Sequence, residues 1–164
     1  MAGHDDSEQG AGTGMEGLPE FDLTGFTPYR AAVAAQFLSE RLAREYRSRF
    51  GISIPDWRVL VHLAHSGGAS VRDIENAVVM EKSKVSRTAS RLESRGLIAK
   101  RPQARDRRLV HLTLTEEGRA LMRELLPLAA AFQAKLESVL GADFESFDRT
   151  LGRLIEMQAG EDPF

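Results

Sequence analysis

The stretch 82–95, with the sequence KSKVSRTASRLESR, constrains the fold of this chain more than any other part. On a helix with 100° per residue, its side chains divide into two faces. The apolar face consists of Val85, Thr88, Ala89 and Leu92. The opposite face is basic and consists of Lys84, Arg87, Arg91 and Arg95, flanked by Ser83, Ser90 and Ser94. Such a helix can pack on a core while it presents cations and short hydroxyl donors to a DNA major groove. The alternative is a solvated surface helix.

Charge is unevenly distributed along the 164 residues. The formal net charge is -2, but residues 1–24 contain six acidic and no basic side chains. Residues 82–111 contain ten lysines and arginines and only two acids, a net charge of +8. Such local asymmetry is typical of a binding site for a polyanion.

Several classes of function are excluded or disfavoured by the composition. The chain has no cysteine, which excludes disulfides, thiolate nucleophiles and cysteine-ligated zinc. It shows no phosphate-binding loop and no nucleophile motif, so we expect neither enzymatic activity nor a cofactor. His62 and His65 are spaced to share a metal ion, but no third ligand is obvious, and we expect no metal site. No membrane span or signal peptide is visible, which leaves the cytoplasm as the expected location.

We expect residues 1–20 to form a disordered tail, because they are rich in glycine and acid and poor in large apolar side chains. Residues 21–51 are predicted to form an arm followed by a helix over 28–50. The arm contains Phe21, Leu23, Phe26 and Tyr29, which suit docking on a hydrophobic surface. The helix has apolar residues at three- to five-residue steps, so it requires a partner, either the core or a second subunit.

Residues 52–114 have the element order of a winged helix-turn-helix. Helices are predicted over 55–65 and 70–78, and Ser70 caps the second with Asp73 as its reciprocal partner. The basic helix 82–95 follows and ends before Gly96. Two strands, 97–101 and 109–114, flank a polar loop that contains arginines, which predicts a β-hairpin wing with a basic tip.

Residues 115–158 are predicted to form two apolar helices, the first running from Thr115 to Leu140 with a bend at Pro127. A short tail, 159–164, follows. Apolar helices on both sides of the basic module suggest a dimerisation region, since two-fold dimers place recognition helices about 34 Å apart. The expected fold is therefore mainly α, with a winged helix-turn-helix DNA-binding domain, a small β-hairpin wing and a helical dimerisation domain.

Three segments carry a resemblance to a known family. They are 54–60 (IPDWRVL), 92–98 (LESRGLI) and 106–119, which contains Asp-Arg-Arg and Leu-Thr-Glu-Glu-Gly-Arg. Together they closely resemble the MarR family of multiple antibiotic resistance regulators, over roughly residues 26–157. The resemblance implies a homodimeric transcription regulator, usually a repressor, that binds a pseudo-palindromic site on double-stranded DNA. It also implies release from DNA by a small, often aromatic and anionic, ligand.

Carried over to matching positions, the resemblance implies DNA-facing side chains at Ser83, Lys84, Ser86 and Arg87. At the wing tip, Arg107 would enter the minor groove, and Arg105 is the second wing arginine expected to bind DNA. Asp106 would hold the wing arginines in place. From the basic face we expect Arg91 to contact DNA as well, whereas Arg95 either does so or pairs with Asp106 or Glu93. Glu81 departs from the family, where serine is more usual, and its carboxylate would weaken or retune phosphate binding.

A candidate effector site consists of Phe37, Arg41 and Trp57, with Arg41 pairing an anionic ligand and the rings stacking on it. The alternative is that these aromatic residues belong to the core. A second function for the whole chain also stays open, a winged-helix module whose basic face binds an acidic protein partner. A mobility shift with DNA from upstream of the chain's own gene separates the two functions.

Overall fold

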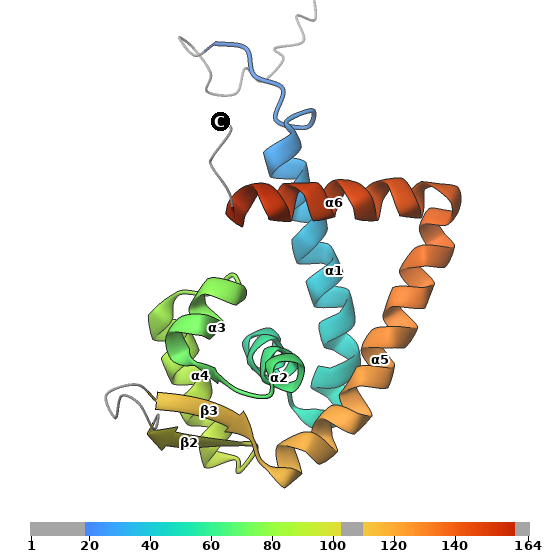
Figure 1. Ribbon diagram of the computed structural model, residues 1–164. Coiled ribbons are helices and arrows are strands. Elements are labelled where there is room, and N and C mark those ends of the chain that lie inside the picture. Colours follow the sequence, from blue (N-terminus) through green and yellow to red (C-terminus); the bar gives the residue numbers. More distant parts are fainter. Residues whose placement is uncertain (1–18, 103–109, 160–164) are drawn as a thin grey trace, which may run out of the picture. The chain divides into compact units, whose positions relative to one another are not determined.

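The computed structural model describes residues 19–102 and 110–159 (Figure 1). Its internal contacts divide the chain into two units, residues 1–36 and 37–164. The described part of the first unit contains the arm and the beginning of helix α1 (Thr27–Phe50), which continues into the second unit. In the arm, the rings of Phe21 and Phe26 meet edge to face with centroids 5.2 Å apart. Both rings stay exposed, so the predicted docking of the arm stays a prediction.

Three short helices form the helix-turn-helix core of the second unit: α2 (Ile54–Ser66), α3 (Val71–Ala77) and α4 (Lys82–Ser94). Their fully buried side chains include Leu60, Leu63, Ile74, Val85 and Leu92. The C-terminal part of α1 adds the ring of Tyr46, which stacks on Trp57 with centroids 5.6 Å apart. Burial raises the pKa of the Tyr46 hydroxyl to about 12, so this phenol stays neutral in the core.

Two capping boxes of the pattern Ser-x-x-Asp begin α2 and α3. At α2, Ser53 Oγ accepts from the Asp56 backbone N–H at 3.3 Å, and Asp56 Oδ2 accepts from the Ser53 N–H at 2.9 Å. Ser70 and Asp73 make the same two bonds at α3, at 3.1 and 2.9 Å, which confirms the predicted cap. The hydrogen bonds from Ser70 hold the pKa of Asp73 below its usual range.

The wing belongs to a three-stranded antiparallel sheet with the strand order β1-β3-β2. Strands β2 (Ile98–Pro102) and β3 (Val110–Leu114) form the predicted hairpin, with Ile98 opposite Leu114 and Pro102 opposite Val110. The third strand, β1 (Ala69–Ser70), pairs with β3. Sequence analysis missed β1 because two residues are too few to show an alternating pattern.

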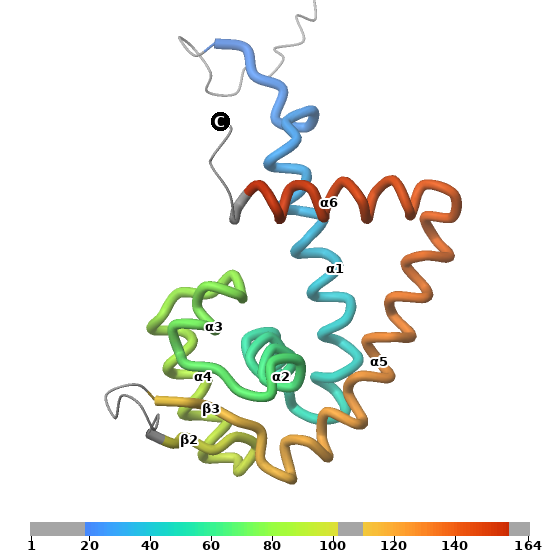
Figure 2. Tube along the Cα trace, in the orientation of Figure 1, coloured from blue at the N-terminus to red at the C-terminus, as the bar shows by residue number. Residues whose placement is uncertain are grey.

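Close backbone packing joins the turn after α4 to the start of α5 (Glu116–Leu140), as the tube in Figure 2 shows. Gly96 ends α4 at φ +71°, and the N–H of Leu97 donates to the Leu92 carbonyl at 3.0 Å. Thr115 caps α5 by accepting from the Gly118 N–H at 3.0 Å, and its hydroxyl donates to the Gly96 carbonyl at 2.6 Å. A Cβ at Gly118 would overlap the Leu97 carbonyl oxygen, so the predicted Thr-Glu-Glu-Gly turn depends on glycine at this position.

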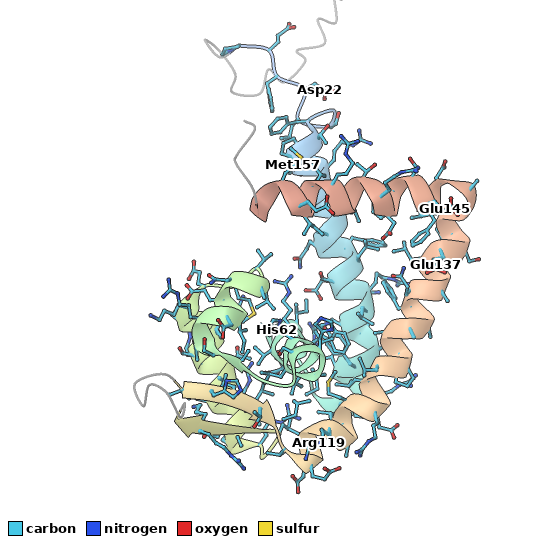
Figure 3. All side chains as sticks on the ribbon, viewed as in Figure 1. Asp22, His62, Arg119, Glu137, Glu145 and Met157 are labelled. Carbon is cyan, nitrogen blue, oxygen red and sulfur yellow. The ribbon has the colours of Figure 1, made fainter. Side chains whose placement is uncertain are left out.

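Arg119, in the first turns of α5, connects this helix to the end of β3, and Figure 3 labels it. Its guanidinium donates to the Leu114 carbonyl at 2.9 Å and to the Glu116 carboxylate at 2.8 Å. The hydrogen bonds that the Glu116 carboxylate accepts from Arg119 and Arg123 hold its pKa below its usual range. The end of the wing and the beginning of α5 therefore form one hydrogen-bonded junction.

Helix α5 continues through Pro127, a 3-10 turn follows over Gly141–Asp143, and α6 (Phe144–Ala159) completes the described chain. Within α5 only Gly118, Met122 and Leu125 are buried. Large apolar side chains of α5 and α6 remain exposed, namely Leu126, Val139, Phe147, Leu151, Leu154 and Ile155. None of the described helices is long and apolar enough to cross a membrane. The predicted fold class is confirmed, since the described chain is mainly helical with a small antiparallel sheet.

Replacing Gly118 with alanine tests the packing of α5 on the α4–β2 turn. The new methyl group would meet a backbone carbonyl, which cannot rotate away, so we expect the free energy of unfolding to fall by about 1–3 kcal/mol. Gly152→Ala in α6 is the matched control, because a Cβ there meets nothing within 4 Å. Alanine at 152 should leave stability unchanged or raise it by up to about 1 kcal/mol. Urea unfolding followed by circular dichroism measures both, and equal effects of the two substitutions would contradict the close packing.

Candidate nucleic-acid interface

Helix α4 has the two faces that its sequence predicts. Val85, Thr88, Ala89 and Leu92 are all buried. The polar side chains of the first two turns are all exposed, namely Lys82, Ser83, Lys84, Ser86 and Arg87. The N-terminal half of α4 therefore presents three cations and two hydroxyl groups to solvent from a helix that is held by its opposite face.

Glu81 occupies the N-cap position of α4, as the sequence predicts. Its side chain makes no capping hydrogen bond, and its backbone carbonyl accepts from the N–H groups of Lys84 and Val85, both at 2.9 Å. The exposed carboxylate thus lies at the same end of α4 as the exposed cations. A negative charge here opposes the approach of a phosphate to that end of the helix.

Arg91 is placed differently from the other basic residues of α4. Its Nη2 donates to Asp56 Oδ1 at 2.6 Å, and its Nε donates to the same oxygen at 3.1 Å. The Asp56 side chain is 3% exposed, whereas that of Arg91 is 48% exposed. Asp56 is therefore a buried ion-pair partner of α4 as well as the N3 residue of the α2 capping box. Its place in a Ser-x-x-Asp box was visible in the sequence, but its pairing with a residue 35 positions away was not.

Of the two partners that the sequence suggests for Arg95, Asp106 lies outside the described residues, and the carboxylate of Glu93 pairs with another residue. The Arg95 guanidinium donates to the backbone carbonyls of Phe50 and Gly51, at 3.1 and 3.2 Å. Glu93 instead pairs with Lys100 of β2 at 2.7 Å, and Lys100 also donates to Ser90 Oγ at 3.1 Å. These contacts tie the base of the wing to α4.

The predicted wing-tip residues Arg105, Asp106 and Arg107 lie outside the described residues. Within the described part of the wing, Arg101 of β2 is exposed. The roles of Arg105, Asp106 and Arg107 at the minor groove therefore stay predictions.

The structure brings together two of the three predicted effector residues. Phe37 and Arg41 line a groove of about 510 Å³ between α1 and α5. Its remaining lining residues are Leu38, Arg44, Glu45, Arg49, Leu128, Ala131, Phe132, Lys135, Leu136 and Val139. Trp57 is not among them, because its ring stacks on Tyr46 in the core. The core alternative thus describes Trp57, while Phe37, which is 61% exposed, is not core within this chain.

The two histidines of α2 do not meet further metal-ligating side chains. No group of three or more histidine, aspartate or glutamate side chains suited to a metal ion occurs within residues 19–102 and 110–159. His62 is half-buried on α2, where Figure 3 labels it, and His65 is exposed.

Comparison with known proteins agrees with this geometry. A sequence profile of the MarR family matches residues 50–109. The chain is 28% identical to the HTH-type transcriptional regulator FarR of Neisseria gonorrhoeae over 119 residues, which are 73% of this chain and 77% of that protein. It is 32% identical over 96 residues to the HTH-type transcriptional repressor MdtR of Bacillus subtilis, which covers 58% of this chain and 62% of that protein.

A solved structure shows the same fold over most of the chain. The PcaV transcriptional regulator of Streptomyces coelicolor, in complex with its natural ligand, matches with a TM-score of 0.68 and 25% sequence identity. The match covers 87% of this chain and 100% of that one. The sequence profile, the relatives and the shared fold together support a winged-helix regulator of the MarR family. A chain with these relatives is a transcription regulator. Members of this family are in general DNA-binding proteins without enzymatic activity.

Asp56→Ala tests the buried ion pair beneath α4. It removes the N3 carboxylate of the α2 capping box and leaves the Arg91 guanidinium without its partner, so we expect a loss of about 2–4 kcal/mol in the free energy of unfolding. Asp73→Ala is the matched control, because it removes an equivalent capping box at an exposed position. That control should lose only about 1 kcal/mol. Chemical unfolding measures the free energy lost in each variant. Equal losses would contradict a stabilising role of the ion pair between Asp56 and Arg91.

Proposed function

We propose that the protein is a cytoplasmic repressor that binds a pseudo-palindromic operator as a homodimer and is released by a small ligand. The observation that carries this proposal is the exposed basic half of α4, which is held from behind by a buried apolar face. A helix presented in this way fits the major groove, where side chains near its N-terminus reach base edges.

Four side chains at the start of α4 are proposed to contact DNA: Ser83, Lys84, Ser86 and Arg87. Lys84 and Arg87 supply the charge that phosphates and guanine edges accept, and the serines supply short hydroxyl donors. At the wing, Arg107 is proposed to enter the minor groove with Arg105 nearby and Asp106 holding the arginines. We leave Arg91 out of the set because its guanidinium already binds Asp56.

The exposed apolar surface of the outer helices supports the dimer. Val139, Leu154 and Ile155 are each at least half exposed in the single chain, as is Phe37 of α1. Large apolar side chains exposed in this number on neighbouring segments of the chain favour an interface, because such side chains lose contact with water when a second copy covers them. A two-fold dimer would place two copies of α4 about 34 Å apart, which matches two successive major grooves on one side of DNA.

The groove between α1 and α5 is the proposed effector site. Its walls combine the Phe37 and Phe132 rings with the cations Arg41, Arg44 and Lys135, so an aromatic acid finds both stacking and charge. The relatives support the two finer parts of the proposal, since MdtR is a repressor and PcaV binds a natural ligand. A ligand that binds better to a dimer with mismatched α4 spacing would lower DNA affinity.

Lys84→Ala and Arg87→Ala test the DNA contacts. We expect wild-type protein to bind DNA from upstream of its own gene with an affinity that falls steeply with salt, because phosphate contacts release counterions. Each substitution should weaken operator binding by about 1–3 kcal/mol if the side chain reads a base, and less on random DNA. Fluorescence anisotropy over a salt series measures both quantities.

An equal loss on operator and random DNA, with the salt slope reduced by about one, would reassign the residue to a phosphate contact. Arg149→Ala is the control, because Arg149 is an exposed cation of α6 and should leave DNA affinity unchanged. A salt dependence that is flat for wild type would contradict DNA binding. It would favour the alternative function, in which the basic face binds an acidic protein.

Arg41→Ala tests the effector site. Benzoate and its hydroxylated derivatives should raise the melting temperature of wild type if one of them binds the folded state. The increase should disappear in Arg41→Ala and fall in Arg41→Lys, which keeps the charge but not the planar fork of donors. A ligand that stabilises wild type and Arg41→Ala equally would place the effector site elsewhere.

A further inference from the structure

Arg91 of α4 and Arg95, the residue that caps its C-terminal end, both bind the segment that connects α1 to α2. Arg95 donates to the carbonyls of Phe50 and Gly51, at the C-terminal end of α1. Arg91 donates to Asp56 in the first turn of α2, and its Nη2 lies 3.3 Å from Ser53 Oγ. On the helix that the sequence predicts, both arginines lie on the same basic face as Lys84 and Arg87. In the structure the N-terminal cations of this face are exposed, while the guanidinium groups of Arg91 and Arg95, although also solvent-accessible, are hydrogen-bonded to other parts of the fold.

The chemistry of each contact suits a fixed attachment. The last carbonyls of a helix lack intrahelical donors and carry partial negative charge, which the two N–H groups of Arg95 satisfy. Asp56 is 2% exposed and accepts from Ser53 with one carboxylate oxygen and from Arg91 with the other. Both oxygens of the Asp56 carboxylate are therefore hydrogen-bonded within the fold.

Apolar packing and these hydrogen bonds restrain α4 in different ways. The buried face of α4, which includes Val85 and Leu92, sets how closely the helix lies on its neighbours, but apolar burial has little directional preference. Hydrogen bonds to a planar guanidinium are directional and weaken steeply when misaligned. Arg91 and Arg95 therefore restrain the tilt and the axial position of α4 relative to the end of α1.

We propose that Arg91 and Arg95 are positioning residues that set the spacing between the two half-sites read by the dimer. This inference rests on the proposed function, in which α1 contributes to the dimer and α4 reads DNA. The anchors lie at the C-terminal end of α4, while the proposed DNA contacts lie at its N-terminal end. At about 1.5 Å per residue, Lys84 is roughly 16 Å along the axis from Arg95. A tilt of about 12° about the anchored end moves Lys84 by roughly 3.4 Å, the rise of one base pair.

The first experiment measures the position of α4 without DNA. The chain has no cysteine, so Ser48→Cys on α1 and Ser83→Cys on α4 place two spin labels at exposed positions. Pulsed electron paramagnetic resonance, on labelled chain diluted with unlabelled chain, gives the distribution of distances within one subunit. We expect a narrow distribution in the otherwise wild-type chain and one at least twice as wide with Arg95→Ala. Arg149→Ala is the matched control and should leave the width unchanged.

The second experiment measures spacing on DNA. The operator is located by footprinting, and its spacer is then varied by one base pair in each direction. We expect wild type and Arg149→Ala to lose at least tenfold in affinity for each change, and Arg95→Ala to lose less than threefold. Arg91→Ala would leave Asp56 buried and unpaired, so the Arg91 arm uses Asp56→Asn combined with Arg91→Gln. That neutral pair should also weaken the preference for one spacer length.

Four outcomes separate the claims. A wider distance distribution together with a lost spacer preference supports the inference. An unchanged distribution in Arg95→Ala overturns it, whether or not the protein binds DNA. A wider distribution with an unchanged spacer preference overturns the link to half-site spacing. Failure of wild type to bind DNA overturns the proposed function, and the half-site role with it, while the distance measurement, made on Arg95→Ala and on the Asp56→Asn, Arg91→Gln pair, still decides whether the arginines position α4.

Discussion

A single buried carboxylate, that of Asp56, joins α4 to the first turn of α2. Asp56 begins α2 through its bonds with Ser53 and at the same time binds Arg91 of α4 at 2.6 Å. A buried charge is tolerated only when its hydrogen bonds are satisfied, and both oxygens of Asp56 have donors. The buried apolar side chains determine which face of α4 is exposed, and the directional contacts with Asp56 restrain the orientation of the helix further.

The same helix therefore performs two tasks with one type of side chain. Near its N-terminus, Lys84 and Arg87 are exposed and available to a polyanion. Near its C-terminus, Arg91 and Arg95 neutralise a carboxylate and a helix end within the fold. Arginine suits the second task because its planar fork can bind two acceptors at once. A net local charge of +8 thus overstates the charge that is free to meet DNA.

Hydrogen bonds and close backbone packing join the wing to α5. Thr115 bonds to the Gly96 carbonyl, and Gly118 allows α5 to lie against the Leu97 backbone. Lys100 connects the base of the wing to Glu93 of α4. A movement of α5 would therefore reach the hairpin and α4 through contiguous hydrogen bonds, which is the physical route that the proposed ligand release requires.

The amino-acid sequence determined the local elements. The 3.6-residue period of apolar residues, the Ser70–Asp73 cap and Gly96 predicted the helices and the wing, because each depends on neighbours within a few positions. The inward and outward faces of α4 followed from the same period, and the family followed from short motifs around it. Only the tertiary structure decided that Arg91 and Arg95 bind partners within the fold, that Trp57 stacks on Tyr46 instead of lining the groove, and that β1 completes the sheet. Each of these depends on partners distant in sequence, which no local periodicity encodes.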